Sequence, residues 1–110
     1  MREALTLSAP VLLRLHRNQL YIKANVFETH FTNVESVALL RKDRELLILP
    51  LATSRAGGFY IKQVNARGDR AIHAADFFRL NGIDENNVHE LAAWPDPLMA
   101  GFVIAEFFQS

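Results

Sequence analysis

Five basic side chains surround two short turns that lie fifty positions apart, and they are the residues best placed to bind an anion. Duplex DNA is held through phosphate contacts from long cationic side chains that gather on one face of a protein. We therefore predict a DNA-binding surface made of these five side chains, with ordinary solvent-facing turn residues as the alternative. They are Arg14, Arg17 and Lys23 around the first turn, and Arg67 and Arg70 around the second.

The sequence offers little that could support catalysis or metal binding. It has no cysteine, and none of its four histidines stands in an HxH or HxxxH pair, so a metal site would need distant residues to converge. The serines and threonines lie in no nucleophile-elbow context, and Gly57-Gly58 precedes an expected strand rather than a helix, unlike a phosphate-binding loop. We expect no enzymatic activity, no cofactor and no metal.

Composition indicates one compact domain over residues 1–110, because half of the residues are hydrophobic and 22% are charged. The formal net charge is zero, so the chain as a whole does not attract nucleic acid. The charge is uneven, however. Up to Arg55 there are eight basic and five acidic residues, and from Ala56 onward four basic and seven acidic. Such a split can steer association between subunits or mark a basic face, and random scatter over the surface is the alternative.

Residues 1–7 lack the pattern of a secretory signal, and no apolar run approaches the roughly 18 residues that a membrane span needs. Together with the absence of cysteine, this favours a cytoplasmic protein without a membrane segment.

A gapless comparison of residues 17–27 with residues 67–77 indicates an internal repeat. The segments that flank the two copies also agree, because each copy has an apolar strand before it and a short helix and two strands after it. We predict internal repeats at approximately 10–50 and 59–107, joined by a short linker at 51–58. The identical positions are Arg17/Arg67, Ile22/Ile72, Ala24/Ala74 and Phe27/Phe77.

Apolar patterning and turn residues predict the same order of elements in each copy. The first copy has expected strands at 10–16, 20–22, 34–40 and 45–49 and a helix at 24–31, with Pro50 as the end of its last strand. The second has strands at 59–64, 70–73, 88–94 and 98–107 and a helix at 74–80 that ends at Asn81-Gly82. The predicted fold is mostly β with two short helices, a pseudo-twofold closed barrel made from two strand-strand-helix-strand-strand repeats. Residues 102–108 are too apolar for a free edge, so we expect them inside the barrel or at a subunit contact.

The segment RGDRAIHAADFFRLNGI, from Arg67 to Ile83, resembles the signature of the AbrB and MraZ family of swapped-hairpin barrels. That signature is a strand, a Lys/Arg-Gly-Arg turn, an Ile/Val-Pro pair and a helix that ends near Leu-Gly-Ile. Residues 17–24 look like a more degenerate copy, and two copies in one chain resemble the tandem arrangement of the MraZ branch. The resemblance implies a small cytoplasmic DNA-binding transcriptional regulator that acts as a homo-oligomer.

Two other functions remain open at this stage. The first is a non-catalytic protein-interaction or accessory module on the same barrel, in which the apolar C-terminal strand drives self-association or docking of a protein partner. The second is ligand capture in a cleft of the barrel, for which the sequence shows no polar constellation.

Overall fold

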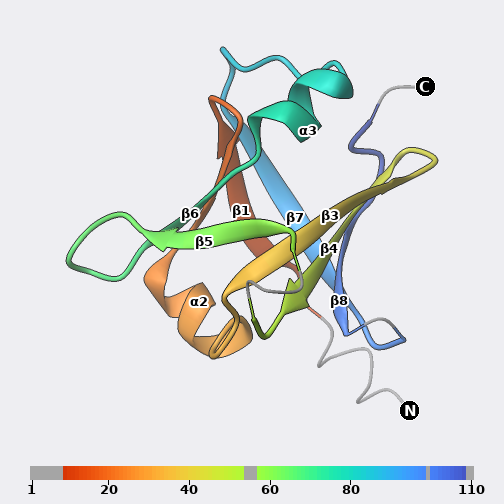
Figure 1. Cartoon of the computed structure of the whole chain (residues 1–110). Helices are drawn as coiled ribbons and strands as arrows, with labels where there is room; N and C mark the ends of the chain where they lie inside the picture. Colours follow the sequence, from red (N-terminus) through yellow and green to blue (C-terminus); the bar gives the residue numbers. More distant parts are fainter. Residues whose placement is uncertain (1–8, 54–56, 99, 109–110) are drawn as a thin grey trace.

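A computed structural model of the chain describes residues 9–53, 57–98 and 100–108, which form a closed barrel of eight strands with two short helices (Figure 1). This confirms the predicted fold class. The first half contains β1 (Val11–His16), β2 (Gln19–Ile22), α2 (Ala24–His30), β3 (Ser36–Lys42) and β4 (Glu45–Leu51). The second half contains β5 (Phe59–Gln63), β6 (Arg70–His73), α3 (Ala75–Leu80), β7 (His89–Asp96) and β8 (Gly101–Ile104).

Hairpins from the two halves alternate around the barrel. The strand order is β1-β2-β6-β5-β3-β4-β8-β7, the ladder between β7 and β1 closes it, and all paired strands are antiparallel. The hairpin β1-β2 therefore lies next to β6 and β7 of the other half rather than next to its own β3-β4. Because neither half makes a continuous sheet of its own, the two halves share one hydrophobic core.

The core follows the two-residue period of the strands. In β1, Val11, Leu13 and Leu15 are buried, whereas the residues between them face outward. The helices α2 and α3 lie on opposite sides of the barrel (Figure 1), and each half contributes a phenylalanine that is 0% exposed, Phe31 or Phe78. The ring of Phe31 stacks on Phe102 with 5.2 Å between centroids, so it ties the end of α2 to β8.

Turn residues take the backbone conformations that the sequence predicts. Arg17 and Asn18 both have positive φ, 53° and 62°, as a two-residue hairpin turn with a right-handed twist requires. Helix α3 ends in a Schellman motif around Gly82, whose φ is 74°. In that motif the Gly82 N–H donates to the Arg79 carbonyl at 3.1 Å, and the Ile83 N–H donates to the Phe78 carbonyl at 3.0 Å.

Most strand boundaries differ from the prediction by one to three residues, among them β3, which is at 36–42 rather than 34–40, and the differences at β4 and β8 have a clear structural cause. Strand β4 continues through Pro50 to Leu51, because β8 pairs with β4 only at residues 46–48 and a proline that lacks an N–H is tolerated beside an open edge. Strand β8 is shorter than predicted. It lies between two residues of positive φ, Ala100 and Glu106, and beyond it the Phe108 N–H donates to the Arg44 carbonyl at 3.0 Å.

The two helices, of seven and six residues, are too short to cross a membrane, and no helix of the described residues is longer. The expectation about a signal at residues 1–7 lies outside the described residues.

Candidate functional site

Three of the five predicted DNA-binding residues line one groove. Arg14 on β1, Lys23 at the start of α2, and Arg67 in the turn before β6 all border a hollow of about 820 Å³, together with His16. The cations come from both copies of the repeat. The fold therefore brings together side chains that are up to 53 positions apart in the sequence.

Acidic partners offset much of this positive charge. Arg14 lies opposite Glu90 in the ladder between β1 and β7, and its Nε is 2.8 Å from a carboxylate oxygen of Glu90. Arg67 lies 2.9 Å from the Asp69 carboxylate. Both acids also line the groove, which therefore holds three basic and two acidic side chains. Exposed ion pairs of this kind contribute only about 0–1 kcal/mol, but the paired acids weaken the attraction of the groove for a phosphate.

Asp69 holds the second turn to the start of α2. Its carboxylate accepts hydrogen bonds from the Asn65 amide at 2.9 Å, the Ala24 backbone N–H at 2.8 Å and Arg67 at 2.9 Å. These bonds, the one from Asn65 foremost, lower the pKa of Asp69 from its usual 3.8 to about 2. Asp69 is therefore ionised at neutral pH and committed to these donors.

The corresponding contact in the other half uses a backbone carbonyl. The Ala74 N–H, at the start of α3, donates to the Asn18 carbonyl at 3.0 Å, and the Asn18 side-chain amide donates to Glu85 at 2.8 Å. Each turn thus supports the first residues of the helix that belongs to the other half. Sequence reasoning identified Asn18 and Asp69 only as turn residues, because a contact between distant segments leaves no local signal.

The remaining two predicted cations lie outside the groove lining. Arg70 pairs with the buried Ile22, and its guanidinium lies 4.0 Å above the ring of Phe27, so it packs against the inner side of the barrel. Arg17 is exposed at the tip of the β1-β2 turn, where its N–H donates to the Glu85 carbonyl at 3.1 Å. Within the described part of the chain, Arg17 and Lys23 form no ion pair.

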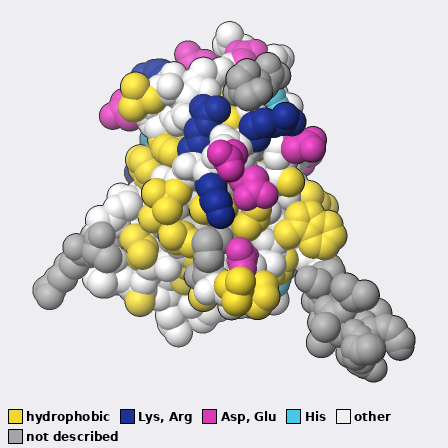
Figure 2. Space-filling model, turned by 90° about the vertical axis from the view of Figure 1, so that its right-hand side faces the viewer, with side chains coloured by type: hydrophobic (Ala, Val, Ile, Leu, Met, Phe, Trp, Pro, Cys, Tyr) yellow, Lys and Arg dark blue, Asp and Glu magenta, His cyan; other side chains and the backbone are white. Residues whose placement is uncertain are grey.

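A row of apolar side chains crosses the outer face of four strands. Leu40 on β3 pairs with Leu47 on β4, Leu47 pairs with Val103 on β8, and Val103 pairs with Trp94 on β7. Both ends of the row are open to solvent, with Leu40 46% and Trp94 45% exposed. Figure 2 shows basic and acidic side chains in the middle of one face of the molecule, with groups of apolar side chains on both sides of them. We call the row Leu40, Leu47, Val103 and Trp94 the outer apolar row.

The sequence contains a signal for this row. Residues 46–49 are Leu-Leu-Ile-Leu, without the polar alternation of a strand that is buried on one face only. Leu46 and Ile48 point into the core, so Leu47 and Leu49 face outward. In the C-terminal segment, by contrast, Phe102, Ile104 and Phe108 are buried in the core. The position of these three side chains inside the barrel accounts for most of the apolar character of this segment.

Among the described residues no three histidine, aspartate or glutamate side chains lie close enough together to hold a metal ion.

Comparison with protein-family models, curated proteins and solved structures finds no match for this chain. The resemblance to the AbrB and MraZ family therefore stays a prediction, and the proposals below depend on the geometry alone.

Proposed function

We propose that this protein is a non-catalytic interaction module that associates with a second copy of itself through the outer apolar row. The observation that carries the proposal is the continuity of that row across β3, β4, β8 and β7, with Leu40 and Trp94 left open to solvent. Leu47, in the middle of the row, is already only 8% exposed, so the free energy gained when a partner covers the row comes chiefly from Leu40 and Trp94 at its ends.

A second copy fits this face because the charges around it are of both signs. Lys42 and Glu45 lie opposite each other at the end of the β3-β4 hairpin, two positions beyond the pair Leu40 and Leu47. A twofold arrangement can place the basic residue of one copy against the acidic residue of the other. The formal net charge of zero also means that two copies do not repel each other over long range.

The mass in solution, measured by sedimentation over a range of concentrations, tests this proposal. The wild-type mass should rise toward twice that of the monomer as the concentration rises. Leu40→Glu should keep the protein monomeric, because it places a charge in the contact. Leu80→Glu is the matched control, since Leu80 is 85% exposed on α3 and lies outside the row. A wild-type protein that stays monomeric at the highest concentration would contradict the proposal.

The groove that contains Arg14, Lys23 and Arg67 favours a second candidate function, the binding of duplex DNA by a homo-oligomeric regulator. The ion pair of Arg14 with Glu90 is exposed on both sides, so a phosphate can replace the Glu90 carboxylate, and Lys23 forms no ion pair among the described residues. Association would repeat the groove in each copy, and several weak sites on one DNA molecule bind more tightly than one.

Binding of a labelled duplex, followed by fluorescence anisotropy at several salt concentrations, tests this second function. The logarithm of the affinity should fall with the logarithm of salt concentration, with a slope of about −0.9 for each phosphate contacted. Lys23→Ala and Arg14→Ala should weaken binding on every sequence, whereas Lys42→Ala should not, because Lys42 does not line the groove. No binding even at low salt would exclude this function and leave the proposed self-association untouched.

A further inference from the structure

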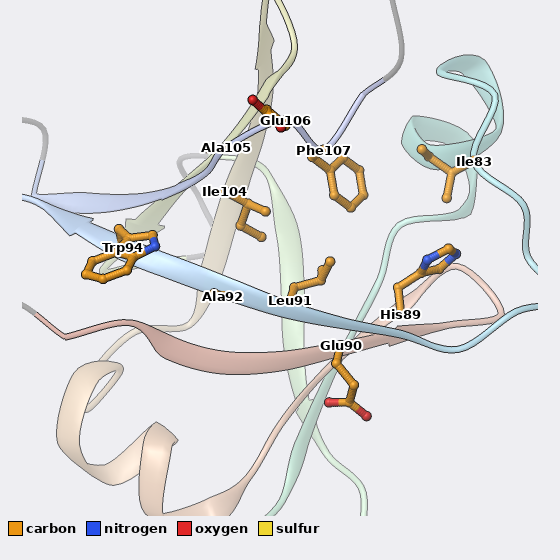
Figure 3. Close-up of a pocket in the computed structure, with 10 residues that line it drawn as sticks. All are labelled: Ile83, His89, Glu90, Leu91, Ala92, Trp94, Ile104, Ala105, Glu106 and Phe107. Atoms are coloured by element: carbon orange, nitrogen blue, oxygen red, sulfur yellow. The ribbon is translucent and has the colours of Figure 1, made fainter.

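The two strands of the hairpin β7-β8 are unpaired along about half of its length, and a hollow of about 360 Å³ lies between them there (Figure 3). Strand β7 pairs with β1 over residues 89–93, but it pairs with β8 only over residues 94–96. Beyond Val103 the chain follows β4 instead, and residues 104–107 form the opposite wall of the hollow.

The equivalent hairpin of the first half is closed. Strands β3 and β4 pair over seven positions, and the Glu35 N–H adds a hydrogen bond to the Leu51 carbonyl at 3.0 Å. The segments that follow the two helices also differ, at Phe31 directly after α2 and at Ile83 three residues after α3. The Phe31 N–H donates to the carbonyl of Phe27, and the Ile83 N–H donates to the carbonyl of Phe78. At this equivalent place the first half has a fully buried phenylalanine and the second half has the smaller, half-buried Ile83.

The inner part of the hollow is apolar, with one imidazole at its side. Figure 3 shows Ile83, Leu91, Ile104 and Phe107 around a common space, with the ring of His89 beside them. The Nε2 atom of His89 is buried and has no hydrogen-bond partner among the described residues. A buried polar atom left unpaired costs about 1–3 kcal/mol, so a bound molecule that supplies the missing hydrogen bond gains this free energy.

The charged residues of the lining restrict the kind of molecule. They are Glu90 and Glu106, both acidic, and their carboxylates point away from the common space in Figure 3. The ten lining residues include no lysine or arginine, so the hollow offers an anion no countercharge. The volume is more than twice the roughly 150 Å³ of an apolar cavity that accepts benzene.

We propose that this hollow is a binding site for a small neutral molecule, aromatic or branched aliphatic, that carries one hydrogen-bonding group directed at His89 Nε2. The site shares one residue with the outer apolar row, Trp94, whose indole lies at the far end of the hollow in Figure 3, whereas Leu40, Leu47 and Val103 do not line it.

Three probes of similar size separate the features of the site: p-cresol, toluene and the p-toluate anion. Titration of the labelled protein, followed by NMR chemical shifts, should show p-cresol perturbing His89, Leu91, Ile104 and Phe107. Its affinity should be about tenfold higher than that of toluene, the value of one additional hydrogen bond, and p-toluate should not bind. No perturbation by p-cresol, equal affinities for p-cresol and toluene, or tight binding of p-toluate would each overturn the proposal.

Two variants locate the site. His89→Leu should reduce the affinity for p-cresol to that for toluene, and His73→Leu, which removes an exposed imidazole on β6, should leave both affinities unchanged. Ile83→Phe, which introduces the residue type that the first half has after its helix, should abolish binding of both probes while the NMR spectrum shows a folded protein. If Ile83→Phe does not fold, His89→Leu still tests the proposal. If His89→Leu kept the higher affinity for p-cresol over toluene, the imidazole would not be the hydrogen-bonding partner, and the proposal would be overturned.

Discussion

Tyr21 lies opposite Ala71 in the ladder between β2 and β6, and these two residues are equivalent positions of the two copies. The neighbouring pairs, Leu20 with Ile72 and Ile22 with Arg70, exchange when each residue is moved by the fifty positions that separate the copies. An approximate twofold axis therefore passes between Tyr21 and Ala71, which is the relationship expected of a duplicated unit that closes one barrel.

The helices depart from this fifty-residue spacing by one position. Helix α2 is preceded by Lys23, whose carbonyl accepts from the Phe27 N–H, and α3 is preceded by Ala74, whose carbonyl accepts from the Phe78 N–H. Phe27 is thus structurally equivalent to Phe78, and the alignment of Phe27 with Phe77 is wrong. The second copy has one extra residue between β6 and α3. It is accommodated at Ala74, whose backbone is not extended, whereas the backbone of Lys23 is extended.

Phe31 should be among the most sensitive positions of the core. Phe31→Ala removes a fully buried ring that stacks on Phe102, and we expect a loss of about 3–5 kcal/mol in the free energy of unfolding measured with urea. Leu80→Ala, at a position that is 85% exposed, should change it by less than about 0.5 kcal/mol. Similar losses in the two variants would show that Phe31 does not tie α2 to the core through Phe102.

Adjacent glycines before β5 should differ in their tolerance of alanine. Both have positive φ, 93° at Gly57 and 83° at Gly58, so alanine at either costs about 1–2 kcal/mol. A Cβ at Gly57 meets open space, whereas a Cβ at Gly58 would lie 2.5 Å from the Val37 carbonyl oxygen. Gly58→Ala should therefore lower the melting temperature clearly more than Gly57→Ala, and the reverse order would contradict the close approach of this turn to β3.

Stability should depend on Asp69 in acid. Its pKa in the folded protein is about 2, below the usual 3.8, so folding favours the ionised form. The stabilisation is fully present above about pH 4 and is lost as the pH falls through 2. In melting curves from pH 5 to pH 2, the difference between the wild type and Asp69→Asn should therefore shrink as the pH falls.

Asp76→Asn, on α3, removes the same charge but none of the hydrogen bonds to Asp69, and it serves as the control for this experiment. A difference between the wild type and Asp69→Asn that stays constant over this range would show that Asp69 does not hold the start of α2.

The sequence predicts the barrel well because its signals are local. Positive φ at Asn18, the helix end at Gly82 and the alternation in β1 each follow from neighbouring residues, and the repeat then indicates how the elements are duplicated. The ends of the strands are harder to predict from the sequence. Whether Pro50 ends β4 depends on how far β8 extends along it, and β8 is shortened by Phe108, which is anchored at Arg44 in another hairpin.

The predicted cationic surface is only partly assembled, because the contacts that decide it also lie between segments that are distant in the sequence. The spacing of Arg14, Lys23 and Arg67 in the two copies indicates that they can meet, and the structure places them along one groove. The carboxylates of Glu90 and Asp69 beside them, and the packing of Arg70 on Phe27, depend on strand register and on contacts between the halves. Composition around a turn does not contain that information.

Trp94 allows the central claim, self-association through the outer apolar row, to be tested directly. It is the only tryptophan of the chain, it is 45% exposed, and it ends the row. A copy that covers the row removes its indole from water. The fluorescence emission should therefore move to shorter wavelength as the protein concentration rises, and Leu40→Glu should abolish that shift. An emission spectrum that is independent of concentration in the wild type, up to the highest concentration reached, would contradict the account.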